Sequence, residues 1–257
     1  MQAEIIILGS GTSMGVPTIG CTCRVCTSPD PRDRRTRPSI AVRWADRCVV
    51  IDTGPDFRFQ ALREGLNHVD AVLYTHAHAD HILGLDDLRP LTFENEHQLP
   101  LYADDEAATV IERVFHYTFD PSSQYPTRAR VEMHRLGKTV GVHGASFHRV
   151  ALIHGRLEVS GFRFGDAAYL TDMNDIPESS LPLLQNLNVL IIDALRKDPH
   201  PSHATLEQAL GFVELLKPQR AFFTHMSHAL HHADTNRELP EHVQLSYDGL
   251  RIPFEIY

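Results

Sequence analysis

The chain has 257 residues, of which 42% are hydrophobic, so it can bury a sizeable core without disulfide support. Its formal net charge of −9 at pH 7 argues against an anionic membrane or an extended nucleic acid as the main partner. We therefore expect phosphate recognition, if present, to be local.

Residues 4–8, with an apolar run from Ile5 to Leu8, predict a buried strand, which a glycine-rich loop follows at residues 9–15. The residues before this strand contain neither a basic region nor an apolar segment long enough for a signal or a membrane span, so we predict a cytoplasmic protein. A glycine loop after a strand is typical of dinucleotide sites. Residues 16–20 do not continue as an amphipathic helix, however, so this interpretation is disfavoured.

Three of the four cysteines, Cys21, Cys23 and Cys26, lie within six residues, which predicts a metal-binding knuckle rather than a disulfide framework. Cys48 lies in a strand-like run and is predicted to be a core residue. Residues 27–38 are rich in proline and arginine and predict a loop. This loop is either a phosphate-attracting patch or a solvated connector, and the connector is favoured because charge runs usually lie in water.

Strands and helices alternate through the rest of the chain in two runs, which predicts an α+β fold with two packed sheets and helices outside them. We expect strands at residues 39–44, 47–52, 69–73, 131–133, 146–153, 157–164, 167–172, 188–193 and 219–224, and a last edge hairpin from residues 243–246 and 251–256. We expect helices at residues 57–64, ending at Gly65, and at 82–88, 104–117, 178–185 and 203–216.

Residues 74–81 organise the chain, because three histidines and an aspartate follow directly after an apolar strand. A packed core would have to provide a hydrogen-bond partner for every ring nitrogen, so this pattern indicates a metal site. Side chains alternate in an extended segment, which places His76 and His78 on one side. A turn can then return Asp80 and His81 to the same place, a geometry that favours two adjacent metals.

Three further ligand-type residues stand at the ends of predicted strands: His154, Asp172 and His225. Each alone would be read as an ordinary polar residue at a strand terminus. Together with the histidine cluster, they become candidate metal ligands.

The pattern His76-x-His78-x-Asp80-His81, with those three strand-end residues, resembles the metallo-β-lactamase superfamily in its dinuclear hydrolase form. The resemblance extends over nearly the whole chain and implies one domain, residues 1–257, folded as an αββα sandwich with its site at one edge of the sheets. It implies that one metal is held by His76, His78 and His154. The other is then held by Asp80, His81 and His225, with Asp172 bridging the two.

His228 lies three residues after His225 and completes a second ligand set with Cys21, Cys23 and Cys26. Three thiolates and one imidazole form a closed, four-coordinate structural zinc site, here within a knuckle inserted at about residues 20–38. This combination is similar to the phosphoribosyl 1,2-cyclic phosphate phosphodiesterases of phosphonate degradation. That resemblance implies that His203 is an active-site residue that contacts the substrate phosphate.

The predicted function is hydrolysis of a small cyclic ribose or nucleotide phosphate, with Asp80 and His203 as the predicted catalytic residues. Two neighbouring divalent cations lower the pKa of a shared water and neutralise the phosphodiester oxygens. Since the ligand set includes carboxylates, Mn²⁺ competes with Zn²⁺ there, whereas the sulfur-rich knuckle selects zinc. The expected partner is a small phosphorylated substrate, and a homodimer stays open.

Three alternatives remain. A tRNA 3′-processing-type endonuclease would share the metal ligands, but the chain has no glycine-rich basic arm to hold RNA. A thioester or lactone hydrolase is open, because the same chemistry attacks acyl carbon. A non-catalytic binding protein that keeps the fold is disfavoured, since all seven ligand positions are filled. A β-lactamase is disfavoured too, because that family lacks the carboxylate found here at Asp172.

Overall fold

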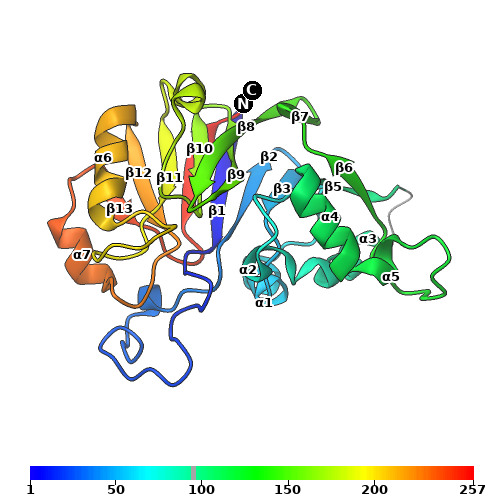
Figure 1. Ribbon diagram of the computed structural model, residues 1–257, viewed down its shortest axis with the longest axis horizontal. Coiled ribbons are helices and arrows are strands. Elements are labelled where there is room, and N and C mark those ends of the chain that lie inside the picture. The colour runs from blue at the N-terminus through cyan, green and yellow to red at the C-terminus, as the bar shows by residue number, and fades with distance from the viewer. Residues whose placement is uncertain (94–96) are drawn as a thin grey trace.

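Two seven-stranded sheets lie face to face in the computed structural model, which describes residues 1–93 and 97–257 (Figure 1). The first sheet has the order β14-β1-β2-β3-β4-β5-β6. Its strands are β1 (Gln2–Gly9), β2 (Ser39–Trp44), β3 (Arg47–Ile51), β4 (Ala71–Leu73), β5 (Leu99–Ala103), β6 (Val131–Arg135) and β14 (Arg251–Glu255).

The second sheet has the order β13-β12-β11-β10-β9-β8-β7. Its strands are β7 (Thr139–Val142), β8 (Ala145–His154), β9 (Leu157–Phe164), β10 (Ala167–Leu170), β11 (Val189–Asp193), β12 (Arg220–Thr224) and β13 (Val243–Leu245).

Helices cover the outer face of each sheet (Figure 1). The first sheet carries α1 (Phe57–Glu64), α2 (Ala79–Ile82), α3 (Arg89–Thr92), α4 (Asp105–Val114), α5 (His116–Phe119) and the 3₁₀ turn Leu85–Leu88. The second sheet carries α6 (Leu206–Leu216), α7 (His232–Glu238) and the 3₁₀ helix Glu178–Leu184, and a further 3₁₀ turn, Pro31–Asp33, lies in the loop between β1 and β2. The predicted α+β, αββα arrangement is confirmed.

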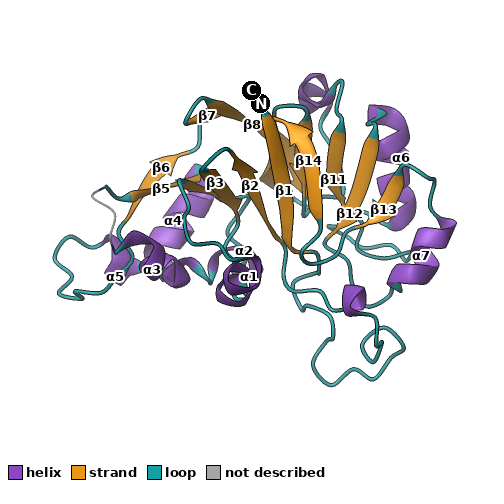
Figure 2. Ribbon diagram, turned by 180° about the vertical axis from the view of Figure 1, so that it is seen from behind, coloured by secondary structure: helices purple, strands orange, loops and turns teal. Residues whose placement is uncertain are grey.

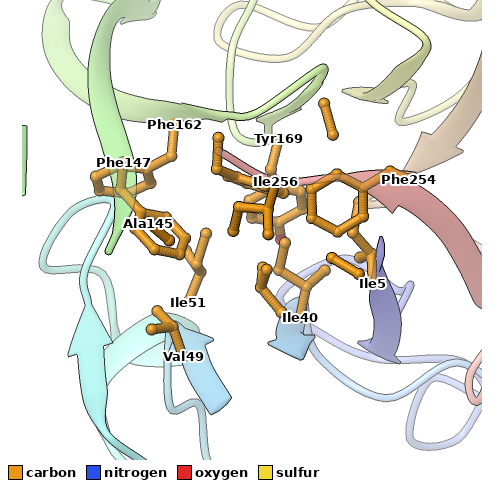
Figure 3. Close-up of a cluster of buried hydrophobic side chains, with 14 of the residues drawn as sticks. Ile5, Ile40, Val49, Ile51, Ala145, Phe147, Phe162, Tyr169, Phe254 and Ile256 are labelled. Atoms are coloured by element: carbon orange, nitrogen blue, oxygen red, sulfur yellow. The ribbon is translucent and has the colours of Figure 1, made fainter. Parts of the chain in front are cut away.

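Strand alternation explains this layering. On β1, Ile5 and Ile7 face the core between the sheets, whereas Ile6 and Leu8 face the helices, and all four are fully buried. Figure 3 shows the core between the sheets, where Phe147, Phe162 and Tyr169 of the second sheet meet Ile40 and Ile51 of the first.

Parallel pairing brings strand ends together at one edge. Strands β3 to β6 are parallel to one another, and so are β10 to β13. Polar residues that follow neighbouring parallel strands therefore gather at the carboxyl edge of the sheets, where open α/β sheets place their ligands.

The predicted C-terminal hairpin is wrong. β13 pairs with β12 in the second sheet, whereas β14 pairs with β1 in the first (Figure 2). The link between them crosses from sheet to sheet, where the Asp248 carboxylate accepts hydrogen bonds from the backbone and hydroxyl groups of Ser10 and Thr36. Each strand thus completes the edge of a different sheet.

Helix ends also differ from the prediction. The helix expected at residues 203–216 begins at Leu206, because Thr205 and Gln208 form a capping box, and His203 therefore lies in the preceding loop. The helix expected at residues 104–117 is divided at Phe115 into α4 and α5, and Asp104 is the N-cap of α4. The helix at residues 57–64 and its stop at Gly65 are confirmed.

The arginine-rich loop is not a solvated connector throughout. The Arg35 side chain is fully buried, pairs with Asp33 at 3.1 Å, and donates hydrogen bonds to the carbonyl groups of Ser227 and Leu230. The preference for a connector is therefore wrong at this residue, whose charge is satisfied by partners distant in sequence. Among the described residues, no helix is long and apolar enough to cross a bilayer.

Candidate metal centre and active site

The segment after β4 carries the histidine cluster. His78, the N-cap of α2, has extended backbone and its ring centroid lies 4.4 Å from that of His76, and the first turn of α2 then reverses the chain at Asp80 and His81. His154, at the end of β8, joins the first two histidines. One donor atom from each of these three residues lies within 4.8 Å of the other two.

Asp80, His81, Asp172 and His225 form a second group of the same dimensions, and all four side chains are buried. Asp172 and His225 come from the ends of β10 and β12. The Asp172 carboxylate lies 3.2 Å from Nε2 of His81 and from Nε2 of His225, and also 4.0 Å from Nε2 of His76. Asp172 is therefore within reach of both groups.

Three strand-end residues adopt left-handed backbone conformations: Asp52, Asp172 and His225, with φ angles of 66°, 55° and 57°. Residues other than glycine rarely adopt positive φ angles. Such strain persists only where the surrounding structure holds it, and it concentrates at functional sites.

Hydrogen bonds from behind orient the imidazoles. Nδ1 of His81 lies 2.7 Å from Asp52, whose carboxylate also accepts from the backbone and hydroxyl groups of Thr75. Nδ1 of His154 donates to the Ser202 carbonyl at 2.8 Å. Engaging Nδ1 in this way leaves Nε2 of each ring as the potential ligand atom, the usual arrangement around a protein-bound metal.

Several potential ligand atoms that face the centre form no hydrogen bond within the described part of the chain. Nε2 of His76, His81 and His225 and one oxygen of Asp80 are buried without a hydrogen-bond partner among the described residues. Burying a polar atom without a hydrogen-bond partner costs folding free energy. Imidazole and carboxylate groups are suitable ligands for Zn²⁺, and the carboxylates also suit Mn²⁺. These residues therefore fit a pair of divalent cations.

The pKa shifts of His76 and Asp172 favour the same role. Despite burial, Asp172 and the neighbouring carboxylates raise the pKa of His81 and His225, so metal binding would release protons from these two imidazoles. Burial, followed by the neighbouring His81, lowers the pKa of His76 well below its ordinary value, so this imidazole keeps a free lone pair. Burial opposes ionisation of Asp172, but the nearby His225 and His81 outweigh it and hold the pKa of that carboxyl well below its usual range.

His203 lies beside the metal centre. Its Nδ1 is 2.8 Å from Asp193, and its ring stacks on His225 at 4.5 Å with an interplanar angle of 11°. A donor atom of His203 lies within 4.8 Å of those of His154 and Asp172. The contact with Asp193 occupies Nδ1 and leaves Nε2 for a substrate.

The predicted knuckle is also assembled. Nδ1 of His228 lies 3.2, 3.6 and 3.3 Å from the sulfur atoms of Cys21, Cys23 and Cys26. Three sulfurs around one imidazole nitrogen fit a four-coordinate zinc ion. The segment between His225 and His228 is held on its other side by the backbone of Ser10 and Thr12, which bonds to Met226.

The structure brings the seven residues predicted for the dinuclear site into two adjacent groups and the four knuckle residues into a third, with His203 beside the first two. The sequence reading missed Asp52, Asp193 and the Ser202 carbonyl, which orient His81, His203 and His154. Asp52 and Asp193 each follow or end an apolar strand, as Asp172 does. This position in the sequence could have indicated that they belong to the site. A backbone carbonyl leaves no signal in a sequence.

Comparison with known proteins agrees with this geometry. A family profile described as "Beta-lactamase superfamily domain" matches residues 47–226, and the chain belongs to the metallo-β-lactamase superfamily of metal-dependent hydrolases. Within it, the chain resembles the PhnP family. The crystal structure of a diphosphatase from that family is 51% identical, with a TM-score of 0.95 over 100% of this chain and 98% of the other.

Two further relatives are more distant or longer. An octanoyltransferase from Porphyromonas gingivalis is 39% identical over 253 residues, which cover 95% of this chain but only 50% of that protein. The chain thus spans half the length of this relative. Zn²⁺-bound PqqB from Methylobacterium extorquens has the same fold, with 20% identity and a TM-score of 0.76 over 97% of this chain and 99% of PqqB.

Proposed function

We propose that the chain is a dinuclear metal-dependent phosphodiesterase that acts on a small cyclic ribose or nucleotide phosphate. The position of Asp172 carries this proposal, because its carboxylate lies within 4.0 Å of Nε2 atoms from both groups of donors. In the proposed centre, His76, His78 and His154 would hold one cation. Asp80, His81 and His225 would hold the other, with Asp172 within reach of both groups.

Two such cations, when bound, supply a deprotonated water at neutral pH and neutralise phosphate oxygens. The protein supplies orientation and a proton. The Asp193 carboxylate fixes the ring of His203 by accepting from Nδ1–H, and in the imidazolium form Nε2–H can then donate to a phosphate oxygen or protonate the leaving alkoxide. All of these donor residues except the exposed His78 are buried, and burial strengthens the charge interactions at the site.

A second candidate is hydrolysis of a diphosphate bond. The PhnP-family protein that is 51% identical to this chain is described as a diphosphatase, and this name favours a phosphorus centre as the point of attack. Both candidates cleave a P–O bond. They differ in whether the leaving group is a sugar alkoxide or a second phosphate.

The octanoyltransferase is twice as long as the region that matches this chain, so its name does not assign acyl transfer to the matched half. Hydrolysis of thioesters and lactones remains an alternative to be tested directly, as do short RNA substrates and a purely binding role.

The decisive experiment is a substrate panel with the metal-loaded protein, read as kcat/KM with one metal at a time. The panel contains ribose cyclic phosphates with and without a further phosphate, cyclic mononucleotides, a nucleoside diphosphate sugar, a short RNA and a thioester. The proposal expects the highest kcat/KM for a cyclic phosphodiester. A preference for the diphosphate would select the second candidate. Turnover of only the thioester, or of nothing at full metal occupancy, would overturn both.

A further inference from the structure

A cavity of about 190 Å³ opens beside the candidate metal centre, between the N-terminal end of α4 and the start of β9. His76 and His78 form part of its wall. His76 is only 5% exposed and its Nε2 has no hydrogen-bond partner, whereas the His78 side chain is exposed. A molecule anchored at the metal centre can therefore extend directly into this cavity.

The cavity has an apolar lining and an acidic rim. Ala107, Val110 and Val159 contribute apolar surface, and Asp104, Glu106 and Glu158 contribute three carboxylates. A volume of about 190 Å³ is below the roughly 300–1,000 Å³ typical of drug-sized ligands, so the space suits a group no larger than a single small ring.

The rim keeps an excess of negative charge. Among the residues that the structure describes, Arg149 is the one cation paired with the rim: its guanidinium lies 3.0 Å from Glu158 and 3.9 Å from Asp104, and its Nε donates to Ser160. One guanidinium is thus shared between two carboxylates. Glu106 is exposed and forms no ion pair with the described residues.

From this arrangement we propose that the cavity binds the non-reacting arm of the substrate and selects a small, hydrogen-bond-donating arm without negative charge. The proposal rests on the proposed phosphodiesterase function. Hydroxyl or ammonium groups on the arm donate to the rim carboxylates, and bonds to an ionised acceptor are the stronger kind. A phosphate or carboxylate on the arm is repelled by the same groups. A substrate with a second phosphate must place it outside this cavity.

The test uses p-nitrophenyl phosphodiesters that share one leaving group and differ in the other arm. The arms are ethanolamine, a neutral diol such as glycerol, and a carboxylate-bearing glycolate of similar size. We expect kcat/KM to be at least about fivefold higher for the ethanolamine and diol arms than for the glycolate arm.

Glu106→Lys should lower the ratio of kcat/KM values between the uncharged or cationic arms and the glycolate arm at least about fivefold. The main cause should be a higher kcat/KM for the glycolate arm. Glu207→Lys is the matched control, because Glu207 is exposed in the first turn of α6 and lies outside the cavity lining. This control should keep the parent preference. Glu158→Gln should shift the preference in the same direction as Glu106→Lys.

Binding of two monoesters to the metal-loaded protein, phosphoethanolamine and 2-phosphoglycolate, measures the same preference by calorimetry without turnover. Tighter binding of phosphoethanolamine, lost in Glu106→Lys, supports the proposal even if no diester is cleaved, and absence of cleavage then counts only against the phosphodiesterase. Equal affinities, or a preference that Glu106→Lys and Glu207→Lys leave equally unchanged, would overturn the cavity proposal while leaving a measured phosphodiesterase activity intact.

Discussion

Oδ2 of Asp52 lies 2.7 Å from Nδ1 of His81, and both side chains are fully buried. Asp52 follows β3 and His81 lies in α2, so this contact joins two segments that leave neighbouring parallel strands. The same carboxylate accepts two hydrogen bonds from Thr75, beside His76. One residue thus orients a candidate ligand and the segment that carries two others.

Asp52→Ala should weaken metal binding at the centre by about 10–100-fold, because loss of a carboxylate behind a ligating histidine frees its ring orientation. Metal affinity measured by competition with a chelator checks this expectation. Asp46→Ala is the control, since Asp46 is 82% exposed in the turn between β2 and β3. Unchanged affinity in the Asp52 variant would remove His81 from the proposed ligand set.

Asp172→Ala should abolish turnover and reduce occupancy from two active-site cations to one or none, because this carboxylate lies within 4.0 Å of Nε2 atoms from both donor groups. Elemental analysis of the purified variant gives the metal content per chain. Asp198→Ala, at an exposed position, should keep the parent content. Retention of two tightly bound active-site metals by Asp172→Ala would refute the shared ligand.

Cys23→Ala should lower thermal stability while leaving the active-site donors in place, because a structural zinc contributes folding free energy. We expect Tm to fall by roughly 5 °C or more, since about 1 kcal/mol corresponds to roughly 2–4 °C in a chain of this length. Thr22→Ala, at the exposed neighbouring position, is the control. Equal Tm values for the two variants would mean that the knuckle has no structural role.

His203→Ala should reduce turnover about 100-fold or more without lowering metal content, because the residue is proposed to donate a proton or hydrogen bond to the substrate. Elemental analysis and initial rates on the same preparation check both parts. His242→Ala, exposed before β13, should match the parent in both measurements. Loss of a metal from His203→Ala would instead make this residue a ligand.

His232 should make stability depend on pH. Burial, followed by the positive charges of Arg32 and Arg35, lowers its pKa from 6.5 to about 4. The unfolded chain therefore takes up this proton first as pH falls, and stability decreases from about pH 6.5 towards pH 4. His232→Asn should show a smaller decrease than the parent in urea unfolding over this window, with His242→Asn as control. Equal slopes in all three proteins would exclude this contribution.

The sequence predicted the sandwich and the metal-type residues because both leave direct signals. Apolar runs end in ligand-type side chains, as after β4 at His76, and parallel strands bring such ends to one edge. Asp193 left the same kind of signal, but only folding shows that it faces His203. Arg35 was misread because its partners, the Ser227 and Leu230 carbonyls, lie about two hundred residues away and are backbone atoms.

The C-terminal strands β13 and β14 were also misassigned, because their partners are distant in sequence. β13 and β14 both read as short edge strands, and nothing local indicates that Asp248 carries the chain from one sheet to the other. A single domain over residues 1–257, a cytoplasmic location, Mn²⁺ or Zn²⁺ as the active-site cation and the oligomeric state stay predictions.

The central claim, a two-metal phosphodiesterase, is tested most directly by titrating metal back into protein whose active site has been depleted while its knuckle zinc is retained. Hydrolysis of bis(p-nitrophenyl) phosphate and bound Mn²⁺ are followed together. We predict that turnover requires the second equivalent of Mn²⁺ and reaches a plateau there. Full activity at one equivalent, or no hydrolysis with two equivalents bound, would contradict the proposed centre.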